Sequence, residues 1–469
     1  MAQAQKLLPQ PDRARAPRRW RAFLVALLVL PALALTACAG AGSLGGGGEG
    51  SRTVTVAIVS NSQMQDAIKL VPEFEKTHPG INVKFVSLSE NQARAKITAS
   101  VATGGNEFDV VMISNYETPQ WAADGWLVNL QPYADKTPGY DPGDFLPKVR
   151  DALSYQGNLY SVPFYGESSF LAYRKDLFQQ AGLTMPDHPT WMQVRDFAAK
   201  LDNKKTGMAG ICLRGLPGWG EVMAPLDTVI NTFGGSWYNT NWDAQLNSPA
   251  TTQAVDFYVN LVRDYGEPGP AVSSFGECAT LMGQGNVAMW YDATSVVTAL
   301  EDPSSSKVVG KIGYVPAPVE KTQHSGWLYT WSLAIPKTSE NKDAAWDFMA
   351  WMTSKDYMHL VGSKLGWGHV PPGSRTSTYQ IPEYQQAAAA YLQPTLDAMN
   401  NADEEHPTAM PVPYTGIQFV SIPEFQDMGT RVSQQISAAI AGQTSVADAL
   451  AESQKYAQTV GDTYKGAAK

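Results

Sequence analysis

Aromatic side chains stand close to charged ones at several points in the chain. Trp290 lies two positions before Asp292, and Arg214 lies five positions before Trp219. An indole offers a flat apolar face to C–H groups, while a carboxylate or guanidinium pairs with hydroxyls. A ligand with the wrong hydroxyl pattern would leave such groups unpaired, at a cost of ~1–3 kcal/mol each. This combination predicts a site for a neutral, hydroxyl-rich ligand.

Carboxylates also allow a function of another class. Glycoside hydrolysis needs two carboxyl groups about 5–10 Å apart, and these come from distant parts of a sequence. Glu117, Glu167 and Asp292 are candidates for such a pair. A secreted glycosidase is therefore the alternative function. Trp346 and Trp351 lie in an apolar run and are assigned to the core.

Other catalytic patterns are missing from the sequence. It contains no P-loop, no GxGxxG after a strand and no His or Cys spacing typical of zinc or iron ligands. The run from Gly166 to Phe170 begins like a nucleophile elbow but has Phe where the second Gly is required. We expect no cofactor, no metal and no catalytic residue.

An alternation of strands and helices is predicted to position these side chains. Residues 53–59, 81–88 and 108–113 are rich in β-branched residues, and apolar residues recur at helical spacing between them. This βαβαβ order predicts an α/β fold with a mainly parallel sheet. Ligands of such sheets lie beyond the carboxyl ends of the strands, here residues 60–63 and 114–117.

The rest of the chain predicts a helix-rich middle part, two further strands and a helical end. The strands are expected over 311–318 and 327–335, and a buried helix over 344–352. Ser445 and Asp448 form a cap-like pair at the start of a last helix.

The N-terminus has the order of a secretory signal. Basic residues up to Arg21 precede an uncharged apolar run, which is shorter than the ~20 residues that a membrane span needs. Residues 35–38 (LTAC) resemble a bacterial lipobox, in which Cys38 is diacylated and becomes the first residue after cleavage. Residues 1–37 are thus predicted to be a lipoprotein signal peptide and 38–52 a Gly-rich tether; an ordinary signal peptide is the alternative.

Net charge differs between the signal segment and the remainder. The formal charge of the whole chain is −9, but residues 1–37 hold six basic residues and one acidic one. The remainder has 29 basic and 43 acidic residues, a net charge of −14. This negative net charge, together with the lack of a dense cluster of basic residues, argues against binding to nucleic acid.

Two cysteines remain after Cys38. Cys212 and Cys278 are compatible with one disulfide in an oxidising location or with two buried thiols, and the sequence leaves both possibilities open.

Several motifs resemble the family 1 extracellular solute-binding proteins of bacterial ABC importers. They are residues 162–178 (VPFYGESSFLAYRKDLF), 285–290 (GNVAMW), 326–328 (GWL) and 334–338 (AIPKT), together with the lipobox and the tether. Residues 212–221 (CLRGLPGWGE), 289–294 (MWYDAT) and 411–416 (PVPYTG) are more narrowly similar to the sorbitol/mannitol-binding branch.

The resemblance implies a periplasmic-binding-protein-like fold of two α/β lobes, each with a mainly parallel sheet flanked by helices, joined by a hinge that the chain crosses several times. One lobe would comprise residues 53–162 plus 312–333, and the other 163–311 plus 334–469. The crossings would lie at 162–165 and 310–313.

The resemblance also implies which side chains contact the ligand in the cleft between the lobes. They are Asn61, Gln65, Tyr116, Glu117, Tyr165, Glu167, Arg214, Trp219, Trp290, Asp292, Trp327 and Trp331. A linear polyol has no ring face to stack on, so a polyol site should depend on the charged groups more than on Trp, whereas a cyclic sugar would reverse that weighting.

The function implied is that of a non-catalytic receptor. It would be a monomer anchored through Cys38 to the outer face of the bacterial cell membrane, where it would capture a polyol or sugar and deliver it to ABC permease subunits. An oligosaccharide receptor is the alternative within the binding class.

Overall fold

The computed structural model describes residues 52–465. The predicted signal peptide, the lipidation site Cys38 and the tether up to residue 51 lie outside the described residues. Within them, no helix is both long and apolar enough to cross a membrane.

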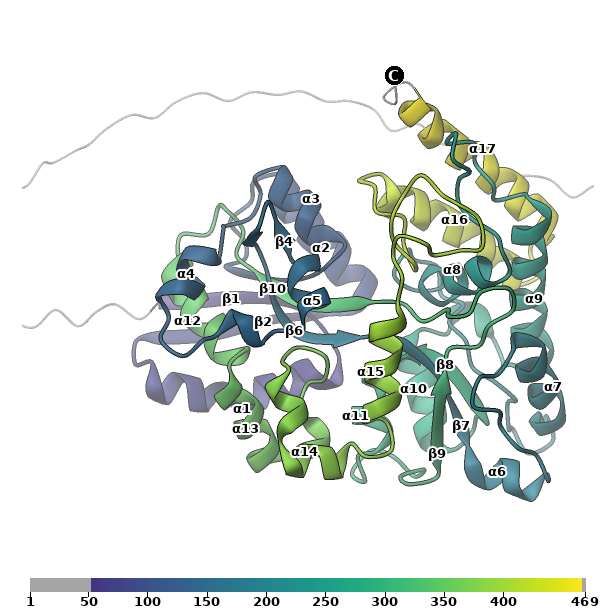
Figure 1. Ribbon diagram of the computed structural model, residues 1–469, viewed down its shortest axis with the longest axis horizontal. Coiled ribbons are helices and arrows are strands. Elements are labelled where there is room, and N and C mark those ends of the chain that lie inside the picture. The colour runs from purple at the N-terminus through teal and green to yellow at the C-terminus, as the bar shows by residue number, and fades with distance from the viewer. Residues whose placement is uncertain (1–51, 466–469) are drawn as a thin grey trace, which may run out of the picture. The chain divides into compact units, whose positions relative to one another are not determined.

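The first sheet contains the predicted βαβαβ unit (Figure 1). Its strand order is β2-β1-β3-β10-β6. Strands β1 (Arg52–Val59), β2 (Ile81–Leu88) and β3 (Val110–Ser114) are parallel, with helices α1 (Ser62–Thr77) and α2 (Glu90–Ala102) between them. β10 (Tyr329–Ala334) runs antiparallel to both β3 and β6 (Val162–Glu167).

Local sequence explains these elements. β1 is buried on both faces from Val56 to Val59, as a central strand between two layers of helices should be. At the start of α1 the side chain of Asn61 accepts a hydrogen bond from the Met64 N–H at 2.9 Å, which satisfies one of the free donors of a helix N-terminus. This cap places Asn61 at the carboxyl end of β1.

The second sheet has the order β8-β7-β9, formed by β7 (Ser169–Arg174), β8 (Met289–Ala293) and β9 (Ile312–Pro316). Both pairings are antiparallel, so the prediction of a mainly parallel sheet in each lobe is wrong here. The chain between these strands does not return through single crossover helices, which is the arrangement that makes neighbouring strands parallel.

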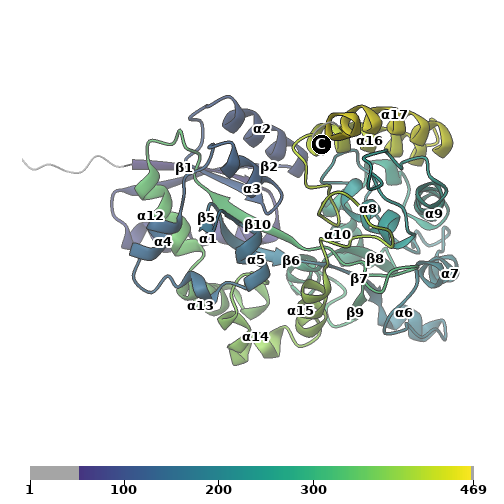
Figure 2. The same cartoon turned by 45° about the horizontal axis from the view of Figure 1, so that its top comes forward.

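Helices cover the second sheet on the side of the C-terminus. Figure 2 shows α16 (Phe425–Ile440) and α17 (Val446–Lys465) in yellow beside α8 (Met223–Thr232) and α9 (Pro249–Tyr265), and both C-terminal helices contact α9. The other elements that flank the two sheets are α3 (Glu117–Ala123), α4 (Gln131–Lys136), α5 (Pro147–Ala152), β4 (Ser154–Tyr155), β5 (Asn158–Leu159), α6 (Lys175–Gln180), α7 (Trp191–Leu201), α10 (Phe275–Gln284), α11 (Val297–Leu300), α12 (Lys342–Met352), α13 (Lys355–Leu365), α14 (Pro382–Ala387) and α15 (Leu392–Asn401).

Two segments belong to a different sheet from the one that the sequence predicted. Ile312–Pro316 was assigned with 312–333 to the first lobe, but β9 pairs with β7 in the second sheet. Residues 334–469 were assigned to the second lobe, but α12 contacts β1 and α1, and α13 contacts α1. Sequence periodicity identifies a strand or helix but not the sheet that it joins, since that choice depends on distant partners.

The chain crosses between the sheets at positions other than those predicted. β6 pairs with β10 through Glu167, and β7 begins at Ser169, so the first crossing is the single residue Ser168 and not 162–165. The next crossing lies between β9 and β10, after Pro316, and not at 310–313.

Candidate functional site

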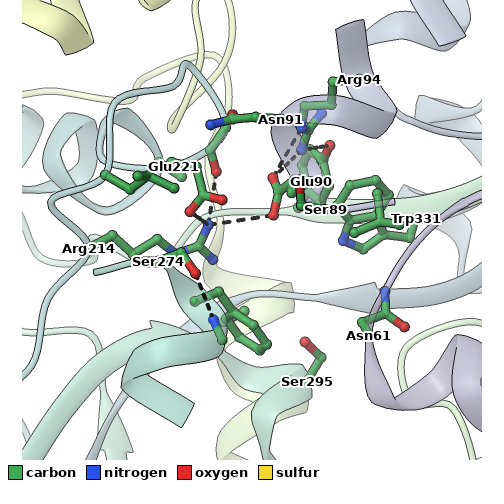
Figure 3. A pocket seen from close by; sticks show the side chains of 18 of the residues that line it. Asn61, Ser89, Glu90, Asn91, Arg94, Arg214, Glu221, Ser274, Ser295 and Trp331 are labelled. Atoms are coloured by element: carbon green, nitrogen blue, oxygen red, sulfur yellow. Dashed lines mark hydrogen bonds and ion pairs between the residues drawn. The ribbon is translucent and has the colours of Figure 1, made fainter. Parts of the chain in front are cut away.

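A cavity of about 320 Å³ lies between the two sheets. Its lining combines the carboxyl ends of β1 and β2, the first turns of α2, strands β6 and β10, the loop around Gly220 and the start of α10. Figure 3 shows Asn61, Glu90 and Arg94 from the first sheet's side facing Arg214, Glu221 and Ser274. The volume is at the lower end of the range typical of small-molecule sites.

Arg94 is buried at the centre of the first sheet's side of the cavity. Its Nε and Nη2 donate to Glu90 Oε1 at 3.0 and 2.8 Å, and Nη2 also donates to the Tyr329 hydroxyl at 2.7 Å. Its Nη1 donates to Glu117 Oε1 at 3.3 Å. Burial by itself lowers the pKa of Arg94, but these neighbours outweigh it and the net shift is upward. The guanidinium is therefore a permanent cation.

Arg214 is the corresponding cation on the other side. Its Nε and Nη2 donate to Asp292 Oδ2 and Oδ1 at 2.8 and 2.7 Å, a two-point ion pair. Its Nη1 lies 3.6 Å from Glu221 and 3.8 Å from Glu90. Glu90 thus stands between the two guanidiniums and links α2 to the second sheet's side, as the dashed lines in Figure 3 show.

The loop around Gly220 packs tightly against α2. A Cβ on Gly220 would lie 2.6 Å from Arg94 Nε, and one on Gly218 would lie 2.4 Å from Asn91 Oδ1. Asn91 Nδ2 donates to the Pro217 carbonyl at 2.9 Å. The absence of a Cβ at these two glycines therefore lets the backbone of the loop lie directly against the side chains of α2.

Two carboxyl groups of the cavity have strongly perturbed pKa values. Burial raises the pKa of Glu167 to about 8, against a smaller opposing effect of the hydrogen bond from Ser295 Oγ at 2.5 Å. Burial and the nearby Glu90 raise the pKa of Glu221 to about 8 as well. Both groups therefore favour the protonated form at neutral pH, in which a carboxyl donates one hydrogen bond and accepts others.

Three polar atoms of residues that line the cavity are buried and have no hydrogen-bond partner among the described residues. They are Trp327 Nε1, Glu221 Oε2 and Gln418 Oε1. One is an indole N–H and two are oxygens, so residues of the cavity wall carry polar groups whose hydrogen bonds the described residues do not satisfy.

Half of the predicted contact residues line this cavity, namely Asn61, Tyr165, Glu167, Arg214, Trp327 and Trp331. The register of β10 against β6 shifts between Trp331 and Ser332, and such bulges re-aim side chains.

The other predicted residues are not among those that line this cavity. Asp292 and Trp290 lie behind Arg214, where the indole N–H donates to Asp292 Oδ2 at 3.2 Å. Glu117 accepts from Ser114 and Arg94, and Gln65 is exposed on α1. The pattern located these residues at strand ends, but β-strand alternation and existing partners direct their side chains away from the cavity.

Tyr116 and Trp219 are likewise occupied by protein contacts. The Tyr116 hydroxyl donates to the Ile422 carbonyl at 2.7 Å. The Trp219 ring lies under the Arg94 guanidinium, 4.1 Å from its centroid, and packs edge-on against Phe419.

Several residues that line the cavity are not among the predicted ones, including Ser89, Glu90, Asn91, Arg94, Glu221, Tyr329 and Gln418. A signal for three of them existed, because Ser89, Glu90 and Asn91 directly follow β2. The carboxyl-end rule that was applied to β1 and β3 also covers this parallel neighbour. Gln418 lies in an irregular segment, and no local pattern marks it.

Cys212 and Cys278 form a disulfide with a Cα–Cα distance of 5.6 Å, which decides between the two possibilities that the sequence left open. The bridge joins the segment just before Arg214 to α10, both of which contribute to the cavity. Glu267 lies near the two sulfurs, but their covalent bond to each other occupies them.

The predicted glycosidase carboxylates do not converge. Glu167 lines the cavity, whereas Asp292 is held by Arg214, and Glu117 by Arg94 and Ser114, outside the lining.

Comparisons with known proteins agree with the two-sheet architecture. The family of bacterial extracellular solute-binding proteins matches residues 60–359. A mannitol-binding protein of Pseudomonas aeruginosa is 45% identical over 403 residues, which cover 86% of this chain and 91% of that protein.

Two solved structures are similar over most of the chain. An ABC transporter solute-binding protein of Agrobacterium vitis with bound D-mannitol has a TM-score of 0.85 and 45% identity, and the match covers 89% of this chain and 99% of that one. A solute-binding protein of Agrobacterium radiobacter in complex with ribitol has a TM-score of 0.76 and 26% identity, with 88% and 99% covered.

Proposed function

Since the chain belongs to the bacterial extracellular solute-binding protein family, we propose that it captures a linear polyol such as mannitol in the cavity between its sheets and delivers it to the permease of an ABC importer. The observation that carries the proposal is the set of three buried polar atoms without a hydrogen bond, on Trp327, Glu221 and Gln418, of which the Glu221 oxygen has only the Arg214 guanidinium at 3.6 Å. A buried polar group without a hydrogen bond costs about 1–3 kcal/mol, so hydroxyls that pair with these groups favour binding by comparable amounts.

Polyol hydroxyls match these groups in chemistry. Each hydroxyl donates one hydrogen bond and accepts others, so a single class of ligand group serves both the indole donor and the two oxygen acceptors. Protonated Glu167 adds a further donor, consistent with its pKa of about 8. A chain with a hydroxyl on every carbon reaches groups on several walls at once.

Charged residues rather than open indole faces dominate the cavity, which favours a linear polyol over a cyclic sugar. Arg94 lies 4.7 Å from the centroid of the Trp331 ring and so covers one of its faces. Trp327 is buried and packs edge-on against Tyr291 at a centroid distance of 6.0 Å. A sugar ring would need a free aromatic face, whereas a polyol needs paired charges and amides.

The relatives support the same ligand class. The similar proteins named above include a mannitol-binding protein, a solute-binding protein with bound D-mannitol and one in complex with ribitol, and both ligands are linear polyols. The cavity of about 320 Å³ favours a ligand of this size over an oligosaccharide.

The protein acts as a receptor and not as a hydrolase. Asp292 is ion-paired with Arg214, and Glu117 is ion-paired with Arg94. Neither is therefore available as the second carboxylate beside Glu167 that the predicted glycosidase pair required.

The N-terminal sequence supports a proposal for where the protein is located. Residues 1–37 serve as the signal peptide, Cys38 carries the lipid, and the Gly-rich tether holds a monomeric receptor at the outer face of the cell membrane. Mass spectrometry of the membrane fraction tests this, since Cys38→Ala should move the protein from the membrane to the medium or periplasm.

Isothermal titration of the protein with a panel of mannitol, sorbitol, ribitol, glucose and maltose tests the ligand class. We expect saturable binding of at least one linear polyol and weaker or no binding of the two cyclic sugars. Trp327→Phe removes the indole donor but keeps an aromatic side chain, and should weaken polyol binding; Trp242→Phe, at a Tyr464 contact remote from the cavity, is the matched control. Absence of saturable binding across the panel would overturn the proposal.

A further inference from the structure

A second cavity of about 330 Å³ adjoins the first. Only Tyr329 and Gln418 line both cavities. These two side chains therefore form the partition between them. Tyr329 comes from β10 and is fixed by the hydrogen bond from Arg94, whereas Gln418 comes from the irregular segment between α15 and α16 (yellow-green in Figure 1).

The segment that carries Gln418 is anchored on both sides. Asn231 Nδ2, on α8, donates to the Ile417 carbonyl at 2.7 Å, and the Tyr116 hydroxyl, at the start of α3, donates to the Ile422 carbonyl at 2.7 Å. The ring of Phe419, next to Gln418, packs against Tyr116, Trp219, Tyr329 and Phe425 at centroid distances of 4.8 to 5.9 Å.

Backbone geometry keeps the segment in this position. Gly416 has a φ of +107°, and a Cβ there would lie 2.1 Å from the Phe419 carbonyl oxygen. Only glycine accommodates both that torsion and that approach. Anchored backbone thus fixes where the side chain of Gln418 stands in the partition.

Gln418 brings a side-chain amide to the partition. The residue is only 6% exposed, and its Oε1 is one of the three buried atoms without a hydrogen-bond partner. An unpaired amide oxygen at the end of a cavity accepts a hydrogen bond from a terminal hydroxyl of a ligand that stops there.

Resting on the proposed function, we propose that Gln418 sets the maximum length of the ligand. It ends the polyol cavity, receives a terminal hydroxyl of the polyol on Oε1, and closes the cavity to any substituent on that hydroxyl. The second cavity has polar lining from Asn115, Asp151, Ser154 and Glu404 and has room for such a substituent once the partition is opened.

Gln418→Ala opens the partition without altering the anchored backbone. The probes are mannitol and mannitol that carries a glucosyl group on a terminal hydroxyl, titrated calorimetrically into the full mature protein. Wild type should bind mannitol and not the glucosyl derivative. Gln418→Ala should bind mannitol roughly tenfold more weakly, as expected for one lost hydrogen bond, and should gain saturable binding of the derivative.

Two further variants keep the test decisive. Gln443→Ala changes an exposed glutamine far from the cavity and should leave both titrations as in wild type. Gln418→Asn keeps the amide but shortens the side chain by one carbon, and it should also weaken mannitol binding. This variant provides the test if the alanine variant melts at too low a temperature to be titrated.

The outcomes separate this proposal from the proposed function. If wild type binds mannitol but Gln418→Ala binds it equally well and still excludes the glucosyl derivative, the length limit is overturned and the polyol receptor stands. Equal binding of both probes by wild type overturns the length limit as well. Failure of wild type to bind any polyol overturns the proposed function, and the length limit with it.

Discussion

The carboxylate of Asp292 holds the guanidinium of Arg214 at two points, with N–O distances of 2.8 and 2.7 Å and with both side chains buried. Of the two, only Arg214 lines the cavity, so under the proposed function Asp292 would act on a ligand by orienting its partner. A fixed guanidinium loses less conformational freedom when it donates to a ligand, which is why buried Arg–carboxylate pairs suit recognition sites.

Asp292→Asn should weaken both the fold and ligand binding. It leaves Arg214 as a buried cation with only the more distant carboxylates Glu90 and Glu221, and breaking a buried pair costs about 3 kcal/mol. Thermal unfolding of the ligand-free protein should show a lower melting temperature, and calorimetry an affinity reduced at least about tenfold. Asp196→Asn disrupts an exposed pair with Arg195 and should do neither; an unchanged melting temperature for Asp292→Asn would contradict the structural role.

Glu90→Gln should weaken ligand binding more than it weakens the fold. Glu90 links Arg94 to Arg214 across the cavity, while each arginine keeps a second carboxylate, Glu117 or Asp292. Loss of the link removes a contact that exists only while the two sides of the cavity are together. The population of molecules in which the two sides are together should therefore fall. X-ray scattering should show a larger radius of gyration than wild type at equal ligand concentration. Glu107→Gln, at the exposed pair with Lys96, is the matched control, and equal affinities for the two variants would argue against the link.

The free energy of unfolding should fall as pH rises, because the buried carboxyl of Glu167 then loses its proton. Burial raises its pKa from 4.5 to about 8 in the folded protein. Between these two pKa values the folded form therefore holds a proton that the unfolded chain has released. The resulting loss in the free energy of unfolding is absent below pH 4.5, grows between pH 4.5 and 8, and is complete above pH 8.

Glu167→Gln removes that titration and tests it. Relative to wild type, the ligand-free variant should gain stability with rising pH, by roughly 2 kcal/mol or more between pH 5 and pH 8. The free energy of unfolding of both proteins is measured by chemical denaturation at each pH. Contributions from groups that titrate alike in both proteins cancel in the difference. A flat difference for Glu167→Gln would show that its carboxyl ionises normally.

Replacement of both bridged cysteines, Cys212→Ser with Cys278→Ser, should destabilise the protein strongly. The bridge closes a loop with a sequence separation of 66, for which the chain-entropy relation gives about 4 kcal/mol. Affinity should change less than stability, because Asp292 continues to hold Arg214. Calorimetric unfolding measures the effect. Two reactive thiols in denatured, unreduced protein that begins after Cys38 would show that the bridge does not form.

Local pattern was sufficient for the elements of the first sheet. β-branched runs gave β1, β2 and β3 within two residues of their observed limits, and helical spacing gave α1 and α2 between them. These signals are local because backbone hydrogen bonds and amphipathic faces repeat every few residues. The same pattern placed Asn61 at the edge of the cavity, since the end of a parallel strand is already defined by where its β-branched run stops.

Which polar side chains face the ligand was decided by tertiary structure. Asp292 and Glu117 were predicted to contact it, yet each is turned to an arginine that lies 78 or 23 residues away in sequence, and that pairing leaves them outside the cavity. Arg94 and Gln418 have no distinguishing local signal, one on a helix and the other in an irregular segment, and only the approach of the two sheets brings them to the cavity. The sequence alone determined the family and the strand-helix order of the first sheet. The partner of each charge depends on free energies of burial and pairing between distant segments, which no local pattern encodes.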